Sequence, residues 1–133
     1  MGRPRKRRPS LPQGFVKLNK QAILRLDGLP PRLFKVYIKL LAAASWSGSS
    51  TGILGFFESP WSLRDIANVI QEDDKQLSKD ILRLRAITMR NERGVVEPLV
   101  YYGKFRGAAE GLTHYYLPHY ALFTEGPPDE GEE

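Results

Sequence analysis

The sequence predicts one small α+β domain, and three observations carry this prediction. Three segments repeat apolar residues at the three- and four-residue spacing of helices with one buried face: residues 31–45, 62–70 and 74–87. Two later segments are rich in β-branched and aromatic residues, as strands are: residues 95–105 and 112–123. The 133 residues, of which 41% are hydrophobic, suffice for one hydrophobic core and not for two folded domains.

The N-terminal half of this domain is predicted to contain a short helix, a long helix and one strand. Residues 19–28 can form a brief helix that their final glycine stops. Pro30 and Pro31 suit the start of the long helix, whose buried face has five members: Leu33, Val36, Tyr37, Leu40 and Leu41. After a connector rich in Ser and Gly, the apolar run 53–59 has the length of one strand, which Pro60 closes.

Two short helices joined by a tight turn are predicted over residues 61–84. Ser59 or Ser62 can cap the first helix, and Asp73 is placed to cap the second. Four residues form the inward face of the first helix: Leu63, Ile66, Ala67 and Ile70. The second helix buries a stripe of apolar residues: Leu77, Ile81, Leu84 and Ile87. Its other face is polar and mostly basic: Lys75, Gln76, Ser78, Lys79, Leu82 and Arg83.

This pair of helices resembles the helix-turn-helix of winged-helix regulators, in which Ser-x-x-Asp-Ile-Ala opens the first helix. Ser62, Asp65, Ile66 and Ala67 match that opening, and apolar residues follow at the family's core positions: Ile70, Leu77, Ile81 and Leu84. Residues 15–45 are similar to the leading segment of winged-helix proteins from phages and plasmids, including replication initiators. The resemblance spans about residues 15–123. It implies a winged helix-turn-helix fold, with a three-helix core and a small antiparallel sheet that forms the wing.

The turn between the two helices departs from the family pattern at four positions. The family usually has Gly at the position of Gln71, an apolar residue at Glu72, and a Ser followed by a basic residue at Asp73 and Asp74. Asp73 is explained as a helix cap, whereas Glu72 and Asp74 would repel phosphates. An acidic side chain at the start of a recognition helix can also accept a hydrogen bond from cytosine N4. The alternative is that the acidic turn, residues 71–74, binds a basic protein partner.

The resemblance implies binding to double-stranded DNA, with the second helix of the pair in the major groove. The side chains expected at the groove are Asp74, Lys75, Gln76, Ser78, Lys79 and Arg83. Lys104 and Arg106 flank the glycine-bounded hairpin tip 107–111, where the wing would touch a phosphate or the minor groove. The implied role is that of a transcriptional regulator of a mobile element or prokaryotic genome. Initiation of plasmid or phage replication is the alternative use of the same site.

Charge is unevenly distributed along the chain, whose formal net charge is +5. Residues 1–10 contain no acid and five basic residues: Arg3, Arg5, Lys6, Arg7 and Arg8. Residues 125–133 contain five acidic residues and no basic one. Both ends are rich in Pro or Gly and poor in apolar residues, so burial cannot offset the entropy of ordering them. We therefore predict a disordered basic arm over residues 1–13, a domain over residues 14–124 and a disordered acidic tail over residues 125–133.

The basic arm has a sequence suited to DNA. Its stretch GRPRKRR resembles the Gly-Arg-Pro core of an AT-hook, although Met1 stands where that motif usually has arginine. Prolines keep such a peptide extended, and the negative potential of a narrow A·T minor groove attracts arginine. A basic arm beside a major-groove helix, as homeodomains have, leads to the same expectation without an exact motif.

Catalysis and metal binding find little support in the sequence. The chain has no cysteine and no Gly-x-x-x-x-Gly-Lys phosphate loop, and His114 and His119, five positions apart on a predicted strand and its end, are expected to face opposite sides of that strand. Helix caps and solvated faces account for the helical aspartates: Asp65, Asp73, Asp74 and Asp80. We therefore expect no enzyme and no cofactor. Five tyrosines cluster in the predicted sheet, where packing in the core with their hydroxyls at the edge is expected in preference to base stacking: Tyr101, Tyr102, Tyr115, Tyr116 and Tyr120.

The sequence also predicts a cytoplasmic protein that does not enter a membrane. No apolar run approaches the roughly 20 residues that a bilayer span requires, and the basic N-terminus lacks the apolar stretch of a signal peptide. A homodimer is compatible with the chain, but no heptad repeat runs long enough to predict a coiled-coil dimer.

Overall fold

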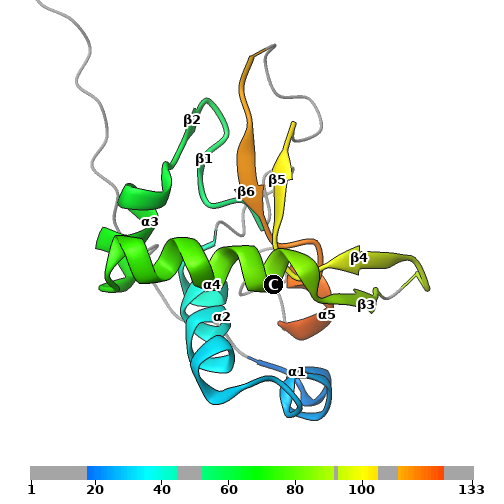
Figure 1. Ribbon diagram of the computed structural model, residues 1–133. Coiled ribbons are helices and arrows are strands. Elements are labelled where there is room, and N and C mark those ends of the chain that lie inside the picture. The colour runs from blue at the N-terminus through cyan, green and yellow to red at the C-terminus, as the bar shows by residue number, and fades with distance from the viewer. Residues whose placement is uncertain (1–17, 45–51, 92, 105–110, 125–133) are drawn as a thin grey trace, which may run out of the picture.

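Three helices form the centre of the fold in the computed structural model, which describes residues 18–44, 52–91, 93–104 and 111–124. They are α2 (Pro31–Ala43), α3 (Leu63–Ile70) and α4 (Asp74–Ala86), and each packs against the other two (Figure 1). The buried faces are those that the apolar spacing predicts, except that Leu63 and Ile87 are only partly buried. The predicted arm 1–13, the tail 125–133, Arg106 and residues 107–110 of the hairpin tip lie outside the described residues.

The two ends of the described domain meet beside a short helix. Helix α1 (Lys20–Leu26) is capped by Asn19, whose side chain accepts a hydrogen bond from the Ala22 amide, so the predicted brief helix is confirmed. Asn19 also donates through its side chain to the carbonyl of Leu122, which lies in helix α5 (Tyr120–Phe123), at 2.6 Å. A β-bridge joins Leu18 to Thr124, so both ends of the described domain are tied together.

Three two-stranded antiparallel sheets accompany the helices among the described residues, and the fold is therefore α+β. Strand β1 (Gly55–Phe56) pairs with β2 (Ser59–Pro60), β3 (Thr88–Arg90) with β4 (Val96–Pro98), and β5 (Tyr101–Gly103) with β6 (His114–Tyr116). In addition, Ile53 forms a bridge with Tyr116, and the Leu54 amide donates to the Tyr115 carbonyl at 2.8 Å. The chain just before β1 thus runs along β6.

The run 53–59 is not the single strand that its length predicts. After the bridge at Ile53 the chain turns at Gly55, whose φ of +113° is a conformation that side chains other than glycine rarely adopt. A Cβ at this position would also lie 2.6 Å from the amide nitrogen of Trp61. Pro60 therefore pairs with Gly55 in a small hairpin and does not close a longer strand.

The two predicted C-terminal strands also differ from the structure. Residues 95–105 contain two strands, β4 and β5, which are separated by the buried pair Leu99 and Val100. The partner of β4 is β3, a strand that the composition of the chain does not predict. Residues 112–123 change from β6 to α5, because the chain beyond Leu117 adopts helical spacing and buries Tyr120 and Phe123.

Candidate nucleic-acid interface

Side-chain caps fix the starts of both α3 and α4, and a short turn joins the two helices. The Ser62 side chain accepts a hydrogen bond from the Asp65 amide, and the Asp65 carboxylate accepts one from the Ser62 amide, which completes a capping box. Gln71 ends α3 in the left-handed conformation, with φ of 60°, which glycine adopts more readily than glutamine does. Asp73 caps α4 by accepting from the Gln76 amide at 2.9 Å, as the sequence predicts.

The Glu72 carboxylate does not face outward from this turn. Its side chain is only 7% exposed, and its two oxygens accept hydrogen bonds from Arg32 Nη2 at 2.9 Å and Lys39 Nζ at 2.6 Å. The hydrogen bond from Lys39, ahead of the charges of Lys39, Arg32 and Lys35, lowers the pKa of Glu72 despite its burial. Glu72 is therefore paired with three cations of α2 and does not stand as an unpaired charge at the turn, which removes the reason to expect that it repels phosphates.

A second buried carboxylate, Asp80, fixes α4 to α2. Asp80 is completely buried, so the prediction of a cap or solvated face does not hold for it. It accepts a hydrogen bond from Arg32 Nε at 3.0 Å and another from the side-chain amide of Gln76 at 3.2 Å. The Gln76 side chain therefore points toward Asp80 and is half-buried. The prediction that it lies on the outward face of α4 is wrong. We call Arg32, Lys39, Glu72, Gln76 and Asp80 the α2–α4 polar network.

The outward face of α4 is rich in cations. Its exposed residues are Lys75, Lys79, Leu82, Arg83, Arg85 and Ala86, and the half-buried Asp74 and Ser78 lie at one border. Arg85 is exposed on this face but is not one of the predicted site residues. Asp74 carries a carboxylate at the start of this face, and its Oδ2 lies 3.8 Å from Arg64 Nε.

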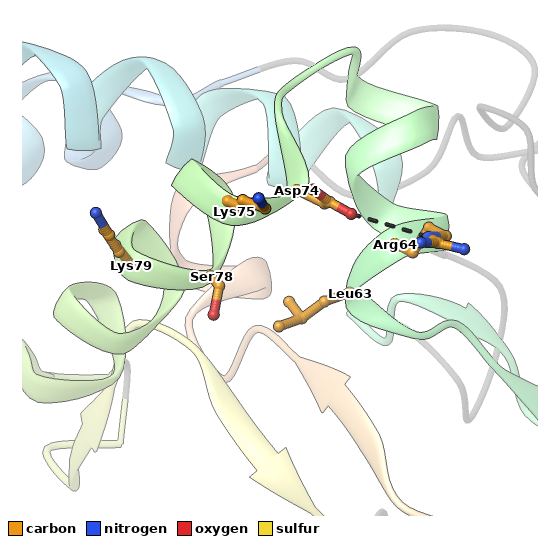
Figure 2. A pocket seen from close by; sticks show the side chains of 6 residues that line it. All are labelled: Leu63, Arg64, Asp74, Lys75, Ser78 and Lys79. Atoms are coloured by element: carbon orange, nitrogen blue, oxygen red, sulfur yellow. Dashed lines mark ion pairs between the residues drawn. The ribbon is translucent and has the colours of Figure 1, made fainter.

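A shallow pocket of about 390 Å³ lies where the N-terminal ends of α3 and α4 meet (Figure 2). Six residues line it: Leu63, Arg64, Asp74, Lys75, Ser78 and Lys79. Four of them are among the predicted site residues, whereas Leu63 and Arg64 are not. Arg64 could have been predicted because the inward residues of α3, Ile66, Ala67 and Ile70, leave its position on the outer side. The pocket combines three cations with one carboxylate that is already paired with Arg64.

The β5–β6 hairpin stands beside the C-terminal half of α4 (Figure 1). The Tyr102 ring packs on Tyr115, with centroids 4.2 Å apart, and its hydroxyl accepts a hydrogen bond from Thr113. The guanidinium of Arg85 lies 5.9 Å from the centre of the Tyr102 ring, within the range of a cation–π contact. The hairpin is thus tied to α4. Lys104 is exposed just beyond β5, and the other predicted wing cation, Arg106, is outside the described residues.

The five tyrosines are not equally buried. Tyr120 is in the core and in a helix, Tyr115 and Tyr116 are partly buried, and Tyr101 and Tyr102 are exposed. Packing in the core is therefore wrong for the two tyrosines of β5. Their rings instead form cross-strand pairs with β6, Tyr101 with Tyr116 at 5.1 Å between centroids.

Both histidines are buried and contact backbone carbonyls. His114 Nε2 lies 3.2 Å and 3.0 Å from the carbonyl oxygens of Phe56 and Phe57, and His119 Nε2 lies 2.9 Å from that of Glu97. Within the described residues, no three His, Asp or Glu side chains are grouped to hold a metal ion. Nor does any helix in this part of the chain have the length and apolar character to cross a bilayer.

Comparison with protein-family models, with curated proteins and with solved structures returns no significant match to this chain. A functional assignment therefore depends on the residues and geometry described above.

Proposed function

We propose that the protein binds double-stranded DNA as a winged helix-turn-helix protein, with α4 in the major groove. The observation that carries this proposal is the outward face of α4, on which Lys75, Lys79, Arg83 and Arg85 are all exposed. A helix of 13 residues is about 20 Å long, and the major groove, about 12 Å wide, admits a helix. Cations along such a helix can reach phosphates and the acceptor atoms of guanine.

The order of the elements supports the winged-helix part of the proposal. The chain runs from α2 through the bridge at Ile53 to α3 and α4, and then into the antiparallel strands β5 and β6. With the bridge residue Ile53 counted as the strand, this is the order helix, strand, helix, helix, strand, strand, to which two hairpins are additions: β1–β2 before α3 and β3–β4 between α4 and β5. In the proposed complex the β5–β6 hairpin is the wing, and Lys104 and Arg106 contact the backbone or minor groove beside the helix.

The proposed role is regulation of transcription in a mobile element or prokaryotic genome, and initiation of replication would use the same surface. The acidic turn offers less to a basic protein partner than its sequence indicates. Glu72 is paired with cations of α2, and Asp73 caps α4. Of the three acids of the turn, this leaves Asp74, which lies beside Arg64, for a basic partner.

Selection from a randomised duplex pool, followed by affinity measurements on the recovered motif, tests the proposal. Lys79→Ala is expected to weaken binding to the selected site by roughly 1 to 3 kcal/mol and to relax the preference at particular positions, because Lys79 points away from the core. Stability should not change. Lys20→Ala, which removes an exposed lysine of α1, is the matched control and should leave affinity unchanged.

Two outcomes would revise the role of this helix. An equal loss on every sequence would make Lys79 a phosphate contact without a part in specificity. If the wild-type protein enriches no motif, and Lys79→Ala binds every duplex as the wild type does, α4 is not the DNA-binding element.

A further inference from the structure

The central stripe of the outward face of α4 changes from cationic to apolar side chains along the helix. Lys75, Lys79, Leu82 and Ala86 follow one another at spacings of four, three and four residues and so form one stripe. Its N-terminal half is cationic, and its C-terminal half is apolar. Leu82 is 61% exposed, and Ala86 is exposed one turn later. An apolar pair thus lies on the centre line of the face that the proposed function places in the groove.

Cations border this apolar pair on both sides. Each residue of a helix is turned by about 100° from the one before it, so Arg83 lies on one side of the stripe and Arg85 on the other. Arg85 is directed by its contact with Tyr102 of the hairpin, at 5.9 Å from the ring centre. An apolar centre between two arginines matches a groove, whose floor of base edges lies between two walls of phosphates.

The chemistry of the groove floor identifies what the apolar pair can contact. Base edges in the major groove present hydrogen-bond donors, acceptors and one apolar group, the C5-methyl of thymine. Lys75 and Lys79 can use the acceptors, whereas Leu82 and Ala86 can use only the methyl. We infer that Leu82 and Ala86 contact thymine methyl groups, so that the C-terminal half of α4 selects A·T pairs. This inference rests on the proposed binding of DNA by α4.

Replacing thymine by deoxyuridine tests this contact directly, because it removes the methyl group and leaves base pairing intact. A duplex recovered from a randomised pool would be remade with deoxyuridine at each thymine in turn. At one or two positions the wild-type protein should bind about fourfold more weakly, since burial of one such group changes an equilibrium by roughly that factor. Leu82→Ala should bind the thymine and deoxyuridine duplexes equally well at the position that Leu82 contacts.

Leu24→Ala is the matched control, because Leu24 of α1 is also an exposed leucine, at 72%. This variant should retain the full discrimination between thymine and deoxyuridine, and thermal melting of both variants should match the wild type. Equal binding of all duplexes by the wild type would overturn the inference while leaving the weaker binding of Lys79→Ala, and with it the proposed function, intact. A Leu82→Ala variant that loses the same affinity on both duplexes would also overturn it. Failure of the wild type to bind any duplex would refute the proposed function itself.

Discussion

Asp80→Ala is expected to lower the free energy of unfolding by about 3 kcal/mol. The substitution removes a completely buried carboxylate that accepts hydrogen bonds from Arg32 at 3.0 Å and Gln76 at 3.2 Å. The bond from Arg32 involves two charged groups and is therefore the stronger of the two. Without Asp80, the Gln76 amide loses its partner, and α4 loses its hydrogen bond to Arg32 of α2. Urea denaturation followed by circular dichroism measures the change.

Asp74→Ala provides the matched control for this prediction. It removes an aspartate from the same helix, but one whose side chain is 43% exposed and lies 3.8 Å from its cation. The expected decrease in the free energy of unfolding is below about 1 kcal/mol, from the weaker interaction with the helix N-terminus. If the two variants were destabilised equally, the α2–α4 polar network would contribute nothing beyond an ordinary surface charge.

The helices could be predicted because their signals are local. Ser62 with Asp65, and Asp73 with the amide of Gln76, interact across three residues, so the caps are visible in the sequence. The role of Asp80 could not be predicted in this way. Its partner Arg32 lies 48 positions away, and only the packing of α2 on α4 brings the two together. The same packing turns Glu72 inward.

The strands were less predictable than the helices for a related reason. A short strand is defined by its partner, and the pairing of Thr88 with Pro98 depends on a turn that the apolar pattern does not mark. Composition also could not separate β6 from α5, since both are aromatic-rich parts of one segment. For the candidate site, the spacing correctly predicted the exposure of Lys75, Lys79 and Arg83. The prediction missed Arg64, although the spacing of α3 places it on the outer side, and Arg85, whose relevance comes from its contact with Tyr102 of the hairpin.

Removal of residues 2–9 is expected to weaken binding to all DNA sequences, by several orders of magnitude at low salt. The deletion takes away all five cations of the basic arm, and for every phosphate that the arm neutralises the slope of log affinity against log salt should fall by about 0.9. The preference among sequences at the major groove should persist, because the arm contributes charge and not base recognition there. Filter binding or fluorescence anisotropy across a salt series measures both quantities.

Truncation after Thr124 tests whether the acidic tail competes with DNA phosphates for the arm, since it removes nine residues that carry five acids and no base; the arm-deleted protein is its control. It should tighten non-specific binding at low salt, where charges act over tens of ångströms, and leave sequence preference intact. An unchanged salt slope after removal of residues 2–9 would mean that the arm does not touch DNA. A preference for A·T flanks that disappears with the arm would place it in the minor groove.

The central claim, that α4 is the surface which meets DNA, is tested most directly by nuclear magnetic resonance of the isotope-labelled protein titrated with a selected duplex. The backbone and side-chain signals of Lys75, Lys79, Leu82 and Arg83 are expected to shift most, together with those of the β5–β6 hairpin. Signals of α1, which packs against α5, should stay in place. Binding that shifts α1 or the β3–β4 hairpin and leaves the outward face of α4 unchanged would contradict the claim.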